Sequence, residues 1–595
     1  MEQQSSSSKS PLTSTPNNSN NVVEDGSTDL KGRPARRDLT GGWKASFFII
    51  GVEIAERLAY HGINSNLVTY LTTVMHESTA TAAKNVNVWA GATTMLPLLG
   101  AFVADSYLGR YWTILLSSVV YLLGLCSLIL ATSITVFRPP PCDSTSFICP
   151  KSSPLQVGFF FFSLYLVALG QGGHKPCLEA FGADQFSDRD QEERKYKASF
   201  FNWWYFGICS GVVLSSFGLS YILENVGWGL GFGIPTVTMA IALCMFIWGT
   251  KFYRHKLSGA SPLTQIIRVF IAVIHKWNVS VPLKEEKLSA VQEHGLKVEV
   301  RRHLLPTKQL RFLDKATVRT ESDYENKSGI NWRLCTVTEV EEVKFVLRLF
   351  PIWGACLMYG VIFAQSPTFF IKQGITMDRK IGSSFEIPAA SLQGFIALSI
   401  IVLIPVYDRI FVPFAKQITG VERGITLLQR IGIGIFCSLL SMVVAALIEM
   451  KRLQAAKDHM VRGVPNETIP LSFFWLLPQC ILLGISDVFA QVGLQEFFYD
   501  QMPDTMKSLG IALYLTILGV GSFMSSILIS IVESITNRGK EQSWFADNIN
   551  KAHLDYYYWL LAALGALFLC IYISLAGCFI YKETECNDSY AEETA

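Results

Sequence analysis

Hydrophobic residues along this 595-residue chain gather into long runs that short polar stretches separate. Each run is about 20 residues or longer, the length that a helix needs to cross a hydrocarbon core of roughly 30 Å. Helices buried in soluble proteins are usually shorter, so the pattern predicts about twelve membrane-spanning helices. The runs lie at 44–73, 85–107, 112–137, 155–182, 198–223, 229–250, 343–370, 385–414, 424–449, 470–499, 508–535 and 555–581.

A polar stretch at 251–342 divides these runs into two sets of six. An acid and an arginine follow the second run, at Asp105 and Arg110, and another such pair, Asp408 and Arg409, ends the eighth. Parallel six-helix repeats are typical of one large class of transporters. We therefore predict an all-α membrane protein with a disordered cytoplasmic N-terminus (1–42), two six-helix bundles (43–250 and 343–582), a central cytoplasmic loop (251–342) and a cytoplasmic tail (583–595).

The orientation of the spans follows from basic residues. Five of them lie between positions 31 and 44, directly before the first run, and the central loop is also basic. The positive-inside rule places both segments in the cytoplasm, and with them both termini. The second half fits this rule less well, because four basic residues fall in a loop expected on the outer side: Lys451, Arg452, Lys457 and Arg462.

Two local patterns flank the start of the second half. Apolar residues recur at helical spacing from Leu263 to Trp277, after Ser261 and Pro262, which are typical of a helix start. We expect an amphipathic helix here that lies on the membrane or on the helical bundle. Thr338 and Glu341 have the spacing of a capping box at the start of the seventh span.

Composition narrows the function classes. Only 16% of the residues are charged and the net charge is +2, which gives no basic field for a nucleic-acid partner. The thirteen cysteines show no zinc-type spacing; Cys142 and Cys149, which share a polar loop expected outside, are candidates for a disulfide. We find no nucleophile motif, metal-spaced cluster or phosphate-binding loop in a suitable context, so the sequence predicts neither an enzyme nor a bound metal or cofactor.

Three charged residues stand inside the first run, at Glu53, Glu56 and Arg57. A charge at the middle of a membrane helix costs roughly 2.5–3.5 kcal/mol on insertion scales, so such residues usually have a function. Glu53 precedes Arg57 by four residues, a favourable order for a pair, and Glu56 lies on the neighbouring face. Because a nearby cation favours the charged form of a buried carboxylate, protonation of either acid can depend on whether Arg57 is engaged elsewhere. This cluster predicts proton coupling; a static charge cluster is the alternative.

Two further spans carry ionisable residues. Lys175 lies in the glycine-rich fourth run, where either a first-helix glutamate or Glu179 could be its partner. The neighbouring His174 alone predicts no more than a polar core histidine. Asp487 lies in the tenth run and is expected to face a cavity, so we interpret it as a solute-binding residue.

Five motifs strongly resemble those of the plant nitrate and peptide transporter family. That family belongs to the proton-coupled oligopeptide transporters of the major facilitator superfamily. The motifs are GVEIAERLAYHG, GAFVADSYLGRY, GQGGHKPCLEAFGADQF, FFNWWYF and TVTEVEEVKFVLRLFPIW, and the resemblance covers the chain beyond residue 40. It implies that Glu53, Glu56, Arg57 and Lys175 couple protons, and that Asp105 and Arg110 form a cytoplasmic gating loop. Asp408 and Arg409 would be the matching gate residues of the second half.

Departures from the family pattern bear on the substrate. Phe363 stands where relatives that bind nitrate through a histidine carry that histidine, Asp487 replaces a glutamate, and Cys209 replaces an asparagine. Ser106 occupies a position that is a phosphorylatable threonine in some relatives. The sequence predicts a proton symporter that works by alternating access around a midplane site, with protons as the coupling ion. That site would be lined by Lys175 and by Tyr60, Asn202, Phe363, Gln365, Trp475 and Asp487.

Nitrate or a di- or tripeptide is the expected solute class, and lipid is the other expected partner. A larger plant metabolite, such as a glycoside or a hormone, is the alternative solute. A uniporter, channel or sensor that uses the charges only structurally is the alternative mechanism. The plasma membrane and the vacuolar membrane both fit the sequence.

Overall fold

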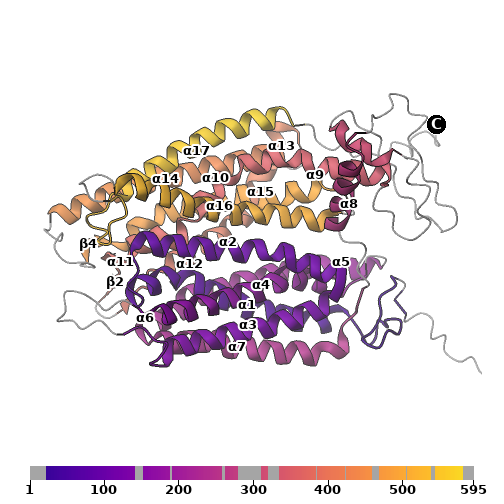
Figure 1. Cartoon of the computed structure of the whole chain (residues 1–595), viewed down its shortest axis with the longest axis horizontal. Helices are drawn as coiled ribbons and strands as arrows, with labels where there is room; N and C mark the ends of the chain where they lie inside the picture. Colours follow the sequence, from indigo (N-terminus) through magenta and orange to yellow (C-terminus); the bar gives the residue numbers. More distant parts are fainter. Residues whose placement is uncertain are drawn as a thin grey trace, which may run out of the picture.

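The computed structural model contains two helical bundles that lie side by side (Figure 1). The N-bundle comprises α1 to α7 and the C-bundle α9 to α17. The structure describes residues 22–23, 25–140, 152–187, 190–256, 262–278, 310–318, 334–382, 385–421, 424–458, 468–503, 506–537 and 543–579. Cys142 and Cys149 lie outside these residues, so their predicted disulfide stays a prediction.

The N-bundle is built from six spans with few breaks. Several spans contain a π-helical turn or a short 3-10 turn, and these turns are given with their helices. The elements are α1 (Gly42–Thr73), α2 (Thr79–Val103) with η2 (Ala104–Leu108), α3 (Arg110–Ser133), α4 (Pro154–Ala183), α5 (Gln191–Val213) with η3 (Leu214–Leu219) and α6 (Ser220–Asn225), and α7 (Trp228–Gly249) with η4 (Thr250–Phe252).

The C-bundle repeats this plan with more interruptions. It contains α9 (Val337–Ala355), α10 (Leu357–Phe363), η8 (Ser366–Phe370), α11 (Ile371–Ile375), α12 (Ser391–Val406), η9 (Tyr407–Phe411), α13 (Val412–Thr419), α14 (Leu427–Asp458), η10 (Phe473–Leu476), α15 (Leu477–Gln501), α16 (Lys507–Thr536) and α17 (Leu554–Gly577). Short strands link the connections between spans: β1 (Met377–Asp378) pairs with β4 (Ile469–Ser472), and β2 (Lys380–Ile381) with β3 (Phe385–Glu386).

The prediction of about twelve spans is confirmed. Among the described residues, 10 helices are long and apolar enough to cross a membrane, and a bent pair, α9 with α10 and α11, makes 11. The remaining span is α1, which has 32 residues but carries the charged cluster. The seventh span differs from the expected straight helix, because it bends by 45° at Cys356.

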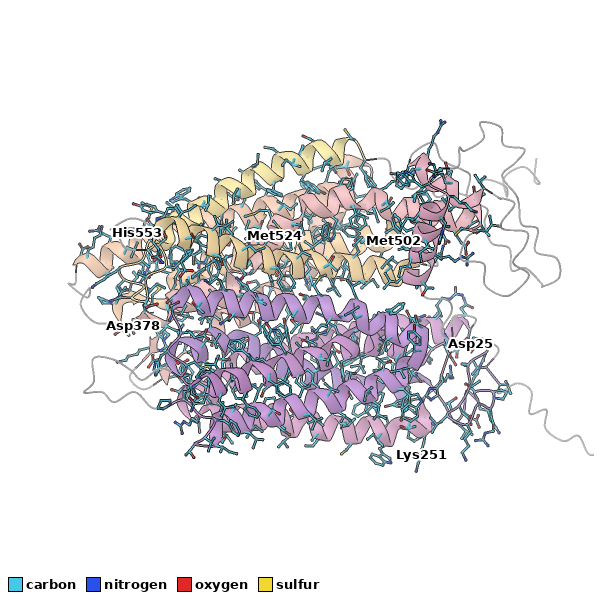
Figure 2. The ribbon with its side chains drawn as sticks, viewed as in Figure 1. Asp25, Lys251, Asp378, Met502, Met524 and His553 are labelled. Atoms are coloured by element: carbon cyan, nitrogen blue, oxygen red, sulfur yellow. The ribbon has the colours of Figure 1, made fainter. Side chains whose placement is uncertain are left out.

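Both described chain ends lie at the same end of the molecule. We call it the terminal end; it carries Asp25, Lys251 and Met502, whereas His553 and Asp378 mark the opposite, distal end (Figure 2). The two acid–arginine pairs predicted as a repeat lie at corresponding places, because Asp105 is in η2 and Asp408 in η9, both of them π-helical turns. A one-residue widening of the helix at the same point of each bundle supports the internal repeat.

The predicted disorder of residues 1–42 is wrong for the part that the structure describes. Residues 25–41 fold against the terminal end of the N-bundle, where Ala35 is fully buried and Thr28 forms a β-bridge with His255. Arg254 ties this segment to α5 by donating to the Thr40 carbonyl and pairing with Glu193 at 2.7 Å. The composition of the segment did not indicate this fold, because a few apolar residues among polar ones are enough to form the hairpin-like structure.

The central loop contains the predicted amphipathic helix, α8 (Pro262–His275). It lies on the C-bundle, where Gln265 donates to Glu342 and Arg268 pairs with Glu339 at 3.1 Å. A short turn, η6 (Arg311–Thr317), packs beside it. The capping box at the start of α9 is formed by Thr336 and Glu339, two residues earlier than predicted, because the helix begins sooner than its apolar face.

The basic residues predicted in an outer loop require a second correction. Helix α14 continues to Asp458, so Lys451, Arg452 and Lys457 are helical, and Arg462 lies outside the described residues. Arg452 is completely buried and paired with Glu449 at 2.6 Å. A buried, paired arginine carries no information about orientation, so Arg452 does not count against the positive-inside rule, whereas Lys451 and Lys457 are exposed.

Candidate functional site

The charged cluster of α1 is buried within the N-bundle. Glu53 and Glu56 are each 1% exposed and Arg57 is 8% exposed. Arg57 donates from Nε to Glu53 at 2.6 Å, and the same nitrogen lies 3.4 Å from Glu56. The i, i+4 spacing therefore produces the pair that the sequence predicted, and a single nitrogen of Arg57 lies near both acids. Among the described residues, no hydrogen bond engages its two terminal nitrogens.

Glu56 differs from Glu53 in its partners. Both of its carboxylate oxygens are buried and neither accepts a hydrogen bond from any described residue. A buried carboxylate without hydrogen-bond donors is unfavourable in its ionised form, because no interaction offsets the free energy of desolvation. Glu53 is thus suited to stay paired with Arg57, and Glu56 is suited to gain and lose a proton.

Lys175 adds a second cation to this site from α4. It is partly buried and lies near enough to Glu53, Glu56 and Glu179 to interact with them electrostatically. None of the three carboxylates is within ion-pair distance of its amine among the described residues. Neither predicted partner is therefore engaged in this state, and Lys175 is available to a solute or to a moving acid.

Aromatic side chains surround the cluster. Tyr60 stacks on Trp89 with ring centres 5.7 Å apart, and its hydroxyl lies 3.5 Å from the Thr93 hydroxyl. Tyr60 therefore joins α1 to α2 one turn beyond Arg57, as its predicted place in the site requires. Such rings give a solute a flat apolar wall beside the charges.

Asp487 lies in α15 and is buried, with 4% exposed; the cavity that the sequence predicted beside it stays a prediction. It accepts a hydrogen bond of 2.6 Å from the hydroxyl of Tyr359 in α10. The sequence did not indicate Tyr359, because an uncharged tyrosine in an apolar run gives no signal that separates it from a core residue. Tyr205 of α5 also lies within electrostatic range, so tyrosines from both bundles lie near this acid.

The other predicted solute-binding residues divide into two groups. Phe363 is partly buried at the end of α10, beside Tyr359, with ring centres 6.4 Å apart. Gln365 is completely buried and donates to the Val361 carbonyl and to Ser525, so it belongs to the packing of α16. Asn202 lies in α5, where only its backbone is described.

Trp475 is misplaced by the sequence prediction. It stands in η10 at the distal end, 44% exposed, with its ring 3.2 Å from the amine of Lys451. Twelve helical residues, about 18 Å, separate it from Asp487. A tryptophan at this position is typical of the lipid–water interface. The prediction was wrong because Trp475 is near Asp487 in the sequence but lies at a different depth in the membrane.

The predicted gate residues lie at the terminal end. Arg110 forms an ion pair with Asp184 at the end of α4, and Asp105 lies near both. Lys256 approaches Asp184 at 3.9 Å and Asp25 at 3.5 Å, which links the gating loop to the folded N-terminal segment. In the C-bundle, Asp408 and Arg409 are exposed. The N-bundle gate residues are thus tied within their own bundle.

Polar contacts between the bundles lie in the distal half of the molecule. Lys84 of α2 pairs with Glu533 of α16 at 2.8 Å, and Asn87 donates to Ser525 at 3.0 Å. The carboxylate of Asp547 accepts from the backbone N–H of Thr79, at the start of α2, at 3.2 Å. The remaining contacts are Lys372 with Thr72, Arg379 with Glu224, Ser391 with Ser216, and Ser526 with the Lys84 backbone. Between described residues, these contacts close the distal end.

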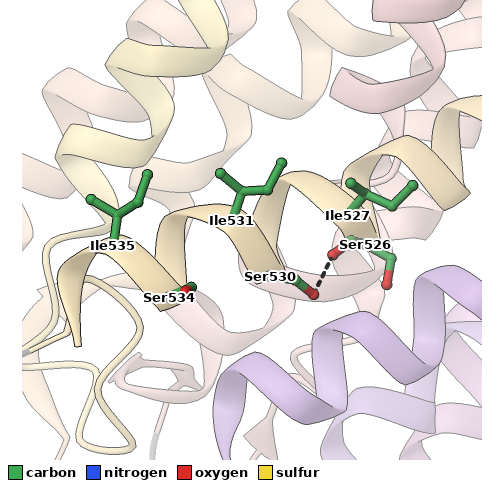
Figure 3. A pocket seen from close by; sticks show the side chains of 6 residues that line it. All are labelled: Ser526, Ile527, Ser530, Ile531, Ser534 and Ile535. Atoms are coloured by element: carbon green, nitrogen blue, oxygen red, sulfur yellow. Dashed lines mark hydrogen bonds between the residues drawn. The ribbon is translucent and has the colours of Figure 1, made fainter. Parts of the chain in front are cut away.

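A groove on α16 lies apart from the charged site. It has a volume of about 480 Å³ and is lined by two rows of small and branched residues (Figure 3). Ile527, Ile531 and Ile535 of the outer row are 50% to 66% exposed. Exposed isoleucines on a membrane helix face lipid, so this groove is part of the outer surface.

Comparison with known proteins decides the family. A family model described as PTR2, the POT family, matches residues 111–545. The chain belongs to the POT family. Because that family is made up of transporters, this POT member is a multi-pass membrane transporter and not an enzyme.

Relatives from Arabidopsis thaliana match the POT member over nearly its whole length. Protein NRT1/PTR FAMILY 5.10 is 50% identical and covers 94% of this chain and 96% of its own. Protein NRT1/PTR FAMILY 5.4 is 46% identical, over 93% and 97%. The resemblance to the plant nitrate and peptide transporter family is thereby confirmed.

Solved structures confirm the fold. An auto inhibited POT family peptide transporter has a TM-score of 0.66 at 21% identity, covering 91% of this chain and 98% of that chain. The POT family transporter PepTSo has a TM-score of 0.63 at 23% identity, covering 90% and 98%. The predicted all-α architecture of the major facilitator type agrees with both.

Proposed function

We propose that this POT family member is a proton-coupled symporter of a small polar solute of the nitrate or di- or tripeptide class. The observation that carries the proposal is Glu56, a buried carboxylate that accepts no hydrogen bond from the part of the chain that the structure describes and lies 3.4 Å from an arginine that already binds Glu53. Such a group is stable when protonated and requires a rearrangement of Arg57 when ionised. Proton binding and the position of Arg57 are then linked.

The free donors of the site support a solute with an anionic group. Among the described residues, no hydrogen bond engages the terminal nitrogens of Arg57 and no ion pair engages the amine of Lys175, and both cations belong to the N-bundle. A nitrate ion or a peptide carboxylate that binds both cations would draw Arg57 away from the acids. The acids would then hold protons more readily, which is the linkage that symport requires.

Asp487 offers the opposite charge across the site. Its tyrosine partner donates to Oδ1, and a peptide amino group would fit at the other carboxylate oxygen. Nitrate has no such group, so the role of Asp487 separates the two solute classes. A larger metabolite, such as a glycoside or hormone, would use the tyrosine and phenylalanine walls instead.

Alternating access in this proposal is a rocking of the two bundles about the charged site. The terminal end faces the cytoplasm, and the distal contacts between Lys84 and Glu533 and around Asp547 would break when the site opens outward. Asp105, Arg110, Asp408 and Arg409 would act at the terminal end during the opposite closure. The plasma membrane and the vacuolar membrane are both compatible with this cycle.

The test is uptake into sealed proteoliposomes that contain only this protein. Nitrate, a panel of di- and tripeptides, and glycosides are offered with an acidic exterior, then with the pH difference collapsed by an ionophore at fixed voltage. The proposal expects accumulation of one nitrate- or peptide-class solute that collapses with the gradient. Equal equilibration in both conditions identifies a uniporter, binding without uptake identifies a sensor, and either result rejects symport.

A further inference from the structure

Four polar side chains lie buried inside the N-bundle, and two of them, Tyr121 and Gln171, interact electrostatically with Glu56. Ser118 and Tyr121 come from α3, and Gln171 and His174 come from α4. Each pair is three residues apart, so both members lie on the same face of their helix. All four are 0% or 1% exposed. They form a buried polar cluster in a bundle whose other helix contacts are largely apolar.

This cluster is held in place by close helix packing. A Cβ atom at Gly170 would lie 2.6 Å from the backbone nitrogen of Tyr121, so the backbones of α3 and α4 meet there. One hydrogen bond, of 2.7 Å, joins Ser118 to Nε2 of His174. The ring of Tyr121 lies 6.4 Å from that of His174. The four side chains therefore have little freedom to find other partners.

Most polar atoms of the cluster have no partner among the described residues. These atoms are the Tyr121 hydroxyl, both ends of the Gln171 amide and Nδ1 of His174, and beside them both carboxylate oxygens of Glu56. Tyr121 and Gln171 both lie within interaction range of Glu56, and the His174 ring lies beside that of Tyr121. Buried polar groups in folded proteins almost always have a partner, and where side chains provide none the partner is internal water.

The hydrogen-bond pattern fixes which atoms donate. The Ser118 hydroxyl donates to the Ile114 carbonyl at 2.8 Å, so toward His174 it can only accept. His174 therefore carries its proton on Nε2, and Nδ1 is an acceptor in the neutral ring. Tyr121 offers a donor, Gln171 a donor and an acceptor, and Glu56 acceptors. A water molecule normally makes about three hydrogen bonds, and this set supplies both kinds of partner.

We propose that Tyr121, Gln171 and His174 form an internal water site against Glu56, which lets this carboxylate lose and regain its proton without leaving the bundle. The proposal rests on the proton-coupled function and deepens it. The three side chains act as positioning residues. When Glu56 is ionised, water held by these side chains donates to it; when it is protonated, its O–H donates to that water.

Other charged groups also face Glu56. From α1 these are Glu53 and Arg57, with the titratable but neutral Tyr60 beside them, and from α4 Lys175. They set a charge balance that the water site does not change, because Tyr121, Gln171 and neutral His174 carry no charge. Their removal should therefore move the pH at which Glu56 titrates, while leaving the cations that bind solute in place.

The test is the pH profile of uptake by Tyr121→Phe and Gln171→Leu in proteoliposomes. Without these groups the ionised carboxylate is less stable, so the midpoint of proton-driven uptake should move about one unit to higher pH. Tyr70→Phe is the matched control, because it removes the same hydroxyl from a buried tyrosine of α1 that stacks on Phe160, four turns from Glu56. Solute counterflow without a pH gradient should be unchanged in all three variants, which establishes that they are folded.

The outcomes separate this inference from the function on which it rests. Midpoints that stay at the wild-type value in both variants, or that move equally in Tyr70→Phe, overturn the water site while symport stands. If the wild-type protein shows no proton-driven uptake, the proposed function itself fails. Should a variant lose counterflow, a wild-type density map decides instead: water within hydrogen-bond distance of Tyr121 and Glu56 supports the site, and a dry contact rejects it.

Discussion

The two ends of this transporter are built in different ways. At the distal end the N-bundle and the C-bundle share hydrogen bonds and ion pairs, from Lys84 with Glu533 to Asp547 at the start of α2. At the terminal end each bundle carries its own cover. The N-terminal segment is bound to the N-bundle through Arg254, and α8 to the C-bundle through Arg268.

The difference indicates which contacts must break in a transport cycle. A cover that belongs to one bundle moves with that bundle and costs nothing when the bundles separate. A contact that joins the bundles must be lost, and it therefore sets the balance between states. The described structure is closed at its distal end, and contacts there should control how often it opens.

Arg452 anchors the distal end and should give the largest effect. Its guanidinium donates to Glu449, to Thr376, to Asn550 and to the Ile549 carbonyl, all fully within the C-bundle. Arg452→Met would leave Glu449 buried without its cation, which costs about 3–5 kcal/mol of stability. A large fall in the thermal unfolding temperature of the purified protein is expected.

The control for this change is the double variant Arg452→Met with Glu449→Leu. Removing both residues leaves no unpaired buried charge, so most of the lost stability should return. If the single variant melts at the wild-type temperature, the network around Arg452 does not anchor the distal end.

Gly91 should give an intermediate effect, on the state of the transporter more than on its fold. A Cβ atom there would lie 2.8 Å from the Phe523 ring and 3.0 Å from the Gly519 carbonyl oxygen, across the bundle interface. Gly91→Leu should disfavour distal closure by about 1–3 kcal/mol. The measurement is labelling of a cysteine introduced at Thr72, which should become more accessible from the distal side. Gly158→Leu, where nothing lies within 4 Å, should leave labelling unchanged.

The ion pair between Lys84 and Glu533 should give the smallest effect. Both side chains are about one quarter exposed, so the pair is worth about 0.2–1 kcal/mol. Lys84→Ala should change the transport rate by at most about fivefold, and Lys84→Glu with Glu533→Lys should restore it. A rate loss beyond tenfold in Lys84→Ala would mean that the distal closure depends on this one pair.

The sequence predicted those parts of the fold that periodicity and length control. The spans were found because an apolar run of about 20 residues has few other structures available. The bend at Cys356, the folded N-terminal segment and the end of α14 were not found, because each depends on a few contacts between distant residues. Arg452 is the clearest case, since its charge indicated a loop and its partners place it in the interior.

The sequence predicted the charged residues of the candidate site, because a charge is costly to place in a membrane helix. Glu53, Glu56, Arg57, Lys175 and Asp487 stood out because ionisable residues are costly in lipid, and the structure buries or partly buries all of them. Tyr359, Tyr121 and Gln171 were not found, because uncharged polar residues are common in membrane helices and give no such signal. The prediction for Trp475 was wrong for a different reason, because a tryptophan ring suits a binding site and a membrane interface equally well.

The central claim is that Glu56 carries the coupled proton, and Glu56→Gln tests it most directly. The amide keeps the size of the side chain and cannot exchange a proton. The measurement compares pH-driven accumulation with gradient-free counterflow of the same solute in proteoliposomes. We expect counterflow to persist and accumulation to disappear. Accumulation at the wild-type level in the variant, collapsing with the pH gradient as before, would contradict the account.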